Sequence, residues 1–123
     1  MELFAVRQYM QQHYTLAPTH KKVAKELKDI AITEMEHCEL LAERIVQLGG
    51  DPTSIIAQEI RHNQSLAQAL LFNRNLEKKT IRQYIRFRDK CRFYEDVVSE
   101  KIFSKLIYDE EKHFEEFEKL RGK

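Results

Sequence analysis

Apolar residues recur every three or four positions along most of this chain, which is the period of an amphipathic helix. The pattern lapses at three places, where proline, glycine or polar residues gather. We therefore expect an all-α fold with four helices, over residues 1–14, 20–48, 64–94 and 100–120.

The first two predicted helices end at recognisable breaks. Ala17 precedes Pro18, and the residue before a proline avoids the helical conformation, so the first helix ends there. Thr19 then offers a good N-cap for the second helix. Gly49-Gly50-Asp51-Pro52 ends the second helix, because glycine accepts the left-handed conformation of a helix end and proline cannot continue the helix.

The middle connection is longer than the other two. Residues 53–63 mix isoleucines with polar residues and show no sustained period, so we interpret them as a crossover loop, with or without a turn of helix. The last connection, residues 95–99, is short and offers Asp96 or Ser99 as a cap. Two short hairpin connections and a loop of about a dozen residues between them are typical of a four-helix bundle with one long crossover between helices two and three.

The composition agrees with this fold class and limits the functions. The chain has 123 residues, which predicts one domain over residues 1–123, with 33% charged residues and only 3 Gly and 2 Pro. The formal net charge of +1 gives no overall field that attracts nucleic acid or an anionic membrane. No apolar run approaches the ~20 residues of a membrane span and no signal peptide is recognisable, so we expect a cytoplasmic protein with neither nucleic acid nor membrane as partner. Cys38 and Cys91 form no Cys-x-x-Cys motif and are expected to be reduced, packed thiols.

Two Glu-x-x-His motifs interrupt the apolar stripes of the second and fourth helices. Glu34 and His37 form one motif, and Glu110 and His113 form the other. Residues three apart in a helix project from the same face, so each pair can reach one metal ion. Because burying an unpaired carboxylate is costly, each motif indicates a bound cation or a salt-bridged polar network, unless the pairs lie on the surface in a different helical phase. The stripes consist of Val23, Leu27, Ile30, Leu41 and Leu48 in the second helix, and of Phe103, Leu106, Phe117 and Leu120 in the fourth.

Two further carboxylates extend this set. Glu77 occupies an inward position of the third helix, where an apolar residue is expected, and Glu2 shares one face of the first helix with Tyr9. A dinuclear carboxylate site in a four-helix bundle uses one Glu from each of two helices and a Glu-x-x-His motif from each of the other two. Four carboxylates and two imidazoles suit two iron ions or manganese, with zinc able to compete. The predicted metal ligands are Glu2, Glu34, His37, Glu77, Glu110 and His113.

The segments around these residues resemble the helix motifs of bacterioferritins, and the resemblance covers almost the whole chain. The matching segments are Glu2–Tyr9, Glu34–His37, Leu76–Glu77 and Asp109–His113, and the intervals between the ligands are also similar. The resemblance implies a ferritin-like bundle that oxidises Fe(II) to Fe(III) with dioxygen or hydrogen peroxide, for iron storage or detoxification. It further implies that Glu34 and Glu110 bridge two irons, that Glu2 with His37 and Glu77 with His113 are terminal ligands, and that Tyr9 lies beside them in the catalytic site.

Met35 points away from the predicted ligands, because it follows Glu34 by roughly 100° of helical rotation. In bacterioferritins, which this segment resembles, a Met at this position ligates haem b across a twofold interface, one Met from each chain. The resemblance therefore implies a haem site and a homo-oligomer, at least a dimer, while packing or dimer contact is the alternative role for Met35 because charged residues flank it. Only ten residues follow His113, so we expect no fifth helix and consider a dimer or smaller oligomer alongside a closed cage.

Two other classes of function stand beside the ferroxidase. A non-enzymatic helical module would use the same residues for a salt-bridged core or a structural cation, without turnover. A small DNA-protecting relative of the ferritins is disfavoured by the balanced charge and the absence of a basic tail.

Overall fold

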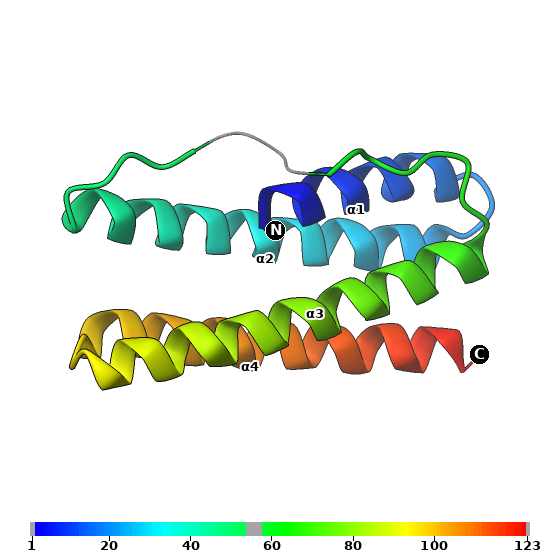
Figure 1. The fold of residues 1–123 in the computed structure, drawn as a ribbon. Coiled ribbons are helices and arrows are strands. Elements are labelled where there is room, and N and C mark those ends of the chain that lie inside the picture. The colour runs from blue at the N-terminus through cyan, green and yellow to red at the C-terminus, as the bar shows by residue number, and fades with distance from the viewer. Residues whose placement is uncertain (1, 54–57, 123) are drawn as a thin grey trace. The chain divides into compact units, whose positions relative to one another are not determined.

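The computed structural model describes residues 2–53 and 58–122, and every regular element in these ranges is an α-helix (Figure 1). The helices begin and end within one to three residues of the positions that the periodicity predicted, which confirms the all-α class. In the described ranges, no helix is long and apolar enough to cross a membrane. The chain divides into two compact units, Met1–Ala69 and Leu70–Lys123. The helices are α1 (Glu2–Leu16), α2 (Lys21–Gln47), α3 (Leu66–Phe93) and α4 (Val97–Arg121).

In the first unit, α1 packs against α2, and the two helices run in opposite directions (Figure 1). The side chains that repeat every three or four positions in α1 are buried, as the amphipathic pattern requires. In α2 the buried positions follow the same period and end at His37, after which the helix becomes more exposed towards its C-terminus. The buried apolar residues are Phe4, Ala5, Val6, Tyr9 and Leu16 in α1 and Ala24, Leu27, Ile30 and Ala31 in α2.

The turn between α1 and α2 corrects one sequence prediction. His20, not Thr19, is the N-cap of α2, and its side chain makes no capping hydrogen bond. The His20 backbone N–H donates to Leu16 O at 2.7 Å, so this residue still closes the turn that ends α1. The Thr19 hydroxyl lies 2.9 Å from His20 Nδ1, so it interacts with the imidazole and does not cap the helix.

The predicted glycine stop of α2 is confirmed, and it has the geometry of a Schellman motif. Gly49 has φ +87°, the left-handed conformation that glycine adopts without strain. Gly49 N–H donates to Val46 O at 3.0 Å and Gly50 N–H donates to Ile45 O at 2.8 Å. Leu48 was predicted to face inward, but it is 62% exposed because the helix ends at Gln47 and Leu48 is its C-cap.

The crossover is fastened to α1 by two buried glutamines. The Gln8 side chain accepts from Arg61 N at 2.7 Å and donates to Arg61 O at 3.0 Å, and Gln12 Nε2 donates to Gln64 Oε1 at 2.8 Å. Residues 58–63 contain no helix, whereas the part of the predicted loop at 54–57 lies outside the described residues. Ser65 and Gln68 then exchange hydrogen bonds at 2.9 and 3.1 Å, a capping box that starts α3.

In the second unit, α3 and α4 form a helical hairpin (Figure 1). Of the two predicted caps, Asp96 is the N-cap of α4, because its side chain accepts from Ser99 N at 3.1 Å. The helix therefore begins at Val97, three residues earlier than predicted. Glu95 takes the left-handed conformation, with φ +58°, at the end of α3.

Aromatic contacts and ion pairs join α3 to α4. Phe103 lies 5.5 Å from Tyr84 and 5.6 Å from Phe87 between ring centroids. Near the open end of the hairpin, Arg74 Nε lies 2.7 Å from Glu118 Oε1. The contacts thus fix the register of the two helices along most of their length.

We expect Gln8→Leu to destabilise the protein by about 1–3 kcal/mol, because it leaves the Arg61 amide and carbonyl without the buried side-chain amide that serves both. Urea unfolding measures this free energy. Arg7→Leu, an exposed substitution on the same helix, is the control and should lie within about 0.5 kcal/mol of the native protein. Equal stability of the Gln8→Leu variant and the control would contradict the fastening role.

Candidate metal centre

Three predicted ligands of the first unit converge inside the protein, and we call them the first ligand group: Glu2, Glu34 and His37. Glu34 and His37 lie one turn apart on α2, and Glu2 is the first residue of α1. Their exposed fractions are 5%, 0% and 1%. His37 Nδ1 lies 3.5 Å from Glu2 Oε2 and 3.7 Å from Glu34 Oε2.

The second unit contains an equivalent set, the second ligand group: Glu77 on α3 and Glu110 and His113 on α4. These side chains are also buried, with exposed fractions of 1%, 1% and 8%. His113 Nδ1 lies 3.8 Å from Glu77 Oε1 and 3.2 Å from Glu110 Oε1. The structure therefore brings together the same kinds of side chain, one Glu and one Glu-x-x-His motif, in each unit.

The distances within each group suit ligands of one cation. Two donors that each lie about 2.1 Å from one metal are about 3.0 Å apart at a right angle and about 4.2 Å apart when opposite. The four Nδ1–carboxylate distances fall between these limits, and only that of 3.2 Å reaches the upper end of a hydrogen bond. One donor atom from each residue of a group lies within 4.8 Å of the others.

The donor atoms favour a hard or intermediate metal ion. Each group offers two carboxylates and one imidazole, a set that suits iron, manganese and zinc. Cys38 follows His37 in sequence but does not add a thiolate, because burial raises the pKa of its thiol and the nearby Glu34 carboxylate raises it further. The thiol is therefore neutral at physiological pH. Cys38 and Cys91 are both reduced thiols, as predicted.

Tyr9 and Met35 occupy contrasting environments. Tyr9 lies two turns after Glu2 on the same side of α1 and is 0% exposed. Met35 is 44% exposed, as expected for a residue that points away from Glu34 and His37. The structure thus leaves Met35 accessible to a partner outside the chain, whereas Tyr9 is enclosed.

Two further polar residues, which were not predicted as part of the site, lie on the inward face of α3. Asn73 is 0% exposed and lies one turn before Glu77, and Thr80 is 3% exposed, with its hydroxyl donating to Leu76 O at 2.9 Å. Asn73, Glu77 and Thr80 are spaced by four and three residues. The same period that identified Glu77 would therefore have identified its two polar neighbours.

Known proteins of one family match this chain over nearly all of its length. The Ferritin-like domain family matches residues 1–123. The bacterioferritin of Desulfovibrio desulfuricans is 36% identical over 121 residues, which cover 98% of this chain and 68% of that protein. The bacterioferritin of Rhodobacter capsulatus is 32% identical over 117 residues, covering 91% of this chain and 70% of that protein.

A solved structure extends the similarity to three dimensions. An X-ray structure of Desulfovibrio desulfuricans bacterioferritin, which shows its diiron site in different catalytic states, matches this structure with a TM-score of 0.96 at 35% identity. The match covers 99% of this chain and 72% of that chain. The predicted ferritin-like four-helix bundle is thereby confirmed.

We expect Glu34→Gln to remove most of the stabilisation that bound metal gives the protein. In a chelator, the variant should melt at or above the temperature of the native apoprotein, because a buried carboxylate is costly to desolvate. With Co²⁺ added, the native protein should gain several degrees in melting temperature and the variant much less, because ligand-bound metal stabilises only the folded state.

Glu36→Gln provides the matched control for this experiment, since Glu36 is an exposed carboxylate on the same helix. It should behave like the native protein with and without Co²⁺. The two variants giving the same melting curves would show that Glu34 does not contribute to metal binding.

Proposed function

Because this chain belongs to the ferritin-like family, and within it to the bacterioferritins, we propose that it binds iron at the two ligand groups together and oxidises Fe(II) to Fe(III). The function is that of a ferroxidase in iron storage and detoxification. Glu2, Glu34 and His37 would hold one iron, and Glu77, Glu110 and His113 would hold the other. As the family resemblance implies, Glu34 and Glu110 would be the bridging carboxylates.

One observation carries the proposal: in each unit a buried imidazole Nδ1 faces two buried carboxylate oxygens within 3.8 Å. Three of the four distances, 3.5, 3.7 and 3.8 Å, exceed the length of a hydrogen bond, and all four lie in the range expected between donors of one cation. Four carboxylates also balance the charge of two divalent cations. This charge balance favours two metal ions over one.

The protein residues have distinct tasks in this proposal. The carboxylates would neutralise the positive charge that the metal ions bring into the interior. The imidazoles would bind through Nδ1, which faces the carboxylates, so that Nε2 would carry the proton of each ring. Tyr9, enclosed near Glu2 on α1, is proposed to donate a hydrogen bond beside the ligands and to hold the local water in place.

Bound by these residues, iron supplies the redox chemistry, in which each Fe(II) gives one electron and dioxygen or hydrogen peroxide accepts a pair. The role of the chain is to hold two reducing equivalents together in a buried, water-poor site. Manganese or zinc would occupy the same donors without this turnover. Elemental analysis of the purified protein identifies the resident metal.

The proposal predicts that Fe(II) added to the apoprotein in air produces ferric-oxo absorbance in the near ultraviolet, with a break near two irons per chain. Glu110→Ala should slow this oxidation by at least about 100-fold, because it removes a bridging carboxylate. Stopped-flow absorbance measures both the rate and the break.

Glu111→Ala is the matched control, because Glu111 is an exposed carboxylate next in sequence. It should retain the native rate. Metal binding without oxidation would instead support the non-enzymatic metal-binding module, and a titration without a break would contradict both ligand groups.

We further propose that the chain forms a homo-oligomer, at least a dimer, in which Met35 contacts a second copy. Bacterioferritins are oligomeric iron-handling proteins, and Met35 is exposed on the side of α2 that faces away from the ligands. Haem b ligated by one Met35 from each of two chains is the more specific form of this proposal. Direct packing of Met35 at the interface is the alternative.

The haem form predicts that added haem b gives the spectrum of a six-coordinate, low-spin iron with about one haem per two chains. Met35→Leu should abolish that spectrum while preserving apolar packing, and Met10→Leu should leave it unchanged. Haem binding that survives Met35→Leu would exclude Met35 as the ligand. The single domain and the cytoplasmic location remain predictions from the sequence.

A further inference from the structure

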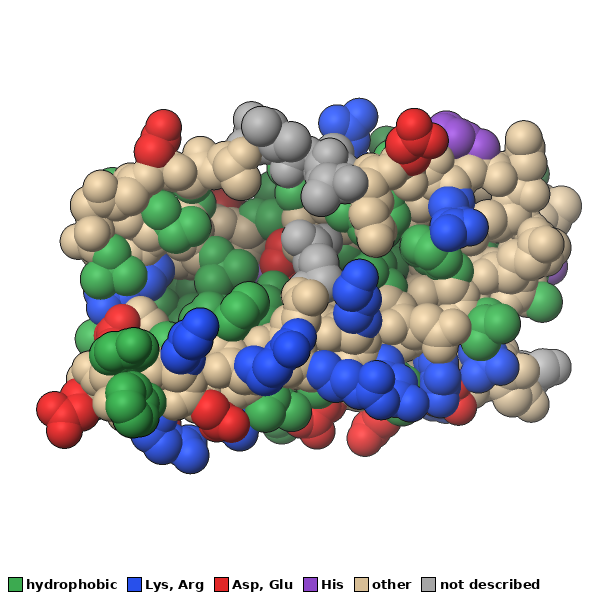
Figure 2. Space-filling view, viewed as in Figure 1, with side chains coloured by type: hydrophobic (Ala, Val, Ile, Leu, Met, Phe, Trp, Pro, Cys, Tyr) green, Lys and Arg blue, Asp and Glu red, His purple; other side chains and the backbone are tan. Residues whose placement is uncertain are grey.

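The charge of this chain is balanced overall but distributed unevenly, and α3 carries the excess of positive charge. Eight Lys and Arg residues lie on this helix against two acidic residues, Glu77 and Asp89. Glu77 is buried in the second ligand group, so it does not offset the exposed cations at the surface. Figure 2 shows Lys and Arg side chains gathered along α3 and α4.

Five of these cations form one exposed surface, which we call the basic stripe. Three other basic residues of α3 are engaged in ion pairs: Arg74 with Glu118, Arg88 with Asp89, and Arg92 with Glu100. The stripe residues have no ion pair with any residue that the structure describes. Four of them follow each other at intervals of four residues, which keeps them on one side of the helix over about 18 Å. The basic stripe consists of Lys78, Lys79, Arg82, Arg86 and Lys90.

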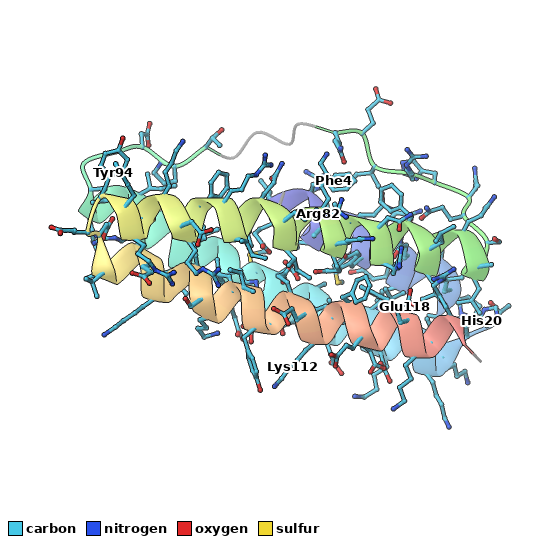
Figure 3. The ribbon with its side chains drawn as sticks, turned by 60° about the horizontal axis from the view of Figure 1, so that its bottom comes forward. Phe4, His20, Arg82, Tyr94, Lys112 and Glu118 are labelled. Atoms are coloured by element: carbon cyan, nitrogen blue, oxygen red, sulfur yellow. The ribbon has the colours of Figure 1, made fainter. Side chains whose placement is uncertain are left out.

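Two exposed aromatic side chains lie at the C-terminal end of the basic stripe. Phe93 is 79% exposed and Tyr94 is 72% exposed, and their rings meet edge to face at a centroid distance of 5.1 Å. Phe93 lies about four turns beyond Lys78, which places it on the same side of α3 as the stripe. Figure 3 shows Arg82 in the middle of α3 and Tyr94 at the turn that follows it.

We propose that the basic stripe and the Phe93–Tyr94 pair bind single-stranded nucleic acid. Cations without carboxylate partners are available to neutralise phosphates, and each such contact releases counterions from the strand. Exposed aromatic rings beside a positively charged surface provide platforms on which unpaired bases stack. In a duplex the base faces are covered by their neighbours, so the aromatic pair favours a single strand.

The opposite side of α3 argues against a membrane surface as the partner. An interfacial helix buries an apolar face in the lipid, but the face of α3 opposite the stripe is already enclosed, with Ala69, Asn73 and Tyr84 buried. The exposed side offers cations and two terminal aromatics instead of a continuous apolar face. The proposal therefore departs from the sequence expectation, which rested on the net charge and not on its distribution.

Fluorescence anisotropy with a labelled 20-mer of thymidine tests the proposal on the full chain at 50 and 200 mM salt. The native protein should bind at low salt and lose affinity steeply as salt increases. Arg82→Glu combined with Arg86→Glu should weaken binding at 50 mM salt by at least about tenfold. Arg82→Gln with Arg86→Gln, which only removes the charge, should act in the same direction with a smaller effect.

The matched control is Lys21→Glu combined with Lys22→Glu, which changes the net charge equally at exposed positions of α2. This variant should lose less than about threefold in affinity. An equal loss in the control and the stripe variant would overturn the proposal, because net charge alone would then explain binding. No binding by the native protein at 50 mM salt would overturn it as well.

Phe93→Ala separates nucleic acid from other polyanions. It should weaken binding of the oligonucleotide by about tenfold through lost base stacking, while binding of heparin stays at the native level. Unchanged oligonucleotide affinity in this variant would overturn the proposal and leave the stripe as a general surface for acidic partners. Ferroxidase activity should stay native in every stripe variant, so this test is independent of the proposed iron chemistry.

Discussion

The burial of ionisable side chains is the constraint on which the rest of this structure depends. Glu2, Glu34, Glu77 and Glu110 are each at most 5% exposed, and two imidazoles are buried with them. Charged groups are costly to bring out of water, and carboxylates of like charge cannot gather without an opposing charge. The buried carboxylates therefore lower the stability of the protein without metal, and cations bound by the two ligand groups would restore it.

Helix geometry and helix packing bring the ionisable side chains of each ligand group together. An α-helix places Glu and His three residues apart on one face, so a single short motif supplies two of the three donors in each unit. The remaining carboxylate comes from the helix packed alongside, which makes each group dependent on the contact between two helices. Gln8 and Gln12 fasten the crossover to α1, the helix that carries Glu2. Polar groups outside the ligand groups thus stabilise the element that positions a ligand.

The features that depend on the helical period were predicted correctly from the sequence. The predictions failed where a side chain could interact with more than one partner. The four helices, the glycine stop at Gly49 and the Asp96 cap follow from local rules, and all agree with the structure. Thr19 satisfied the same capping rules as Asp96, yet its hydroxyl engages the His20 ring and the helix begins one residue later. Leu48 continues the apolar period of α2, but the helix ends at Gln47, so Leu48 does not lie on its inward face.

No pattern in the sequence indicates the polar contacts between residues far apart in the chain. Gln8 binds Arg61, 53 residues away, and no periodicity or motif connects two such positions. The proposal that the two ligand groups act as one centre likewise does not follow from the period of any single helix. It was inferred from donor count and family resemblance, and for that reason it is tested by the stoichiometry of iron binding.

The two faces of α3 show why the net charge alone does not describe the surface that a partner would meet. Glu77 and the stripe cations occupy opposite sides of a helix whose diameter with side chains is about 10–12 Å. Glu77 is 1% exposed and belongs to the second ligand group, whereas the stripe cations face the solvent. A phosphate at the surface would therefore contact the cations and not the buried carboxylate, although both enter the net charge with equal weight. A sum over the whole chain cancels charges that lie on separate faces of the folded helix and that would act on separate ligands.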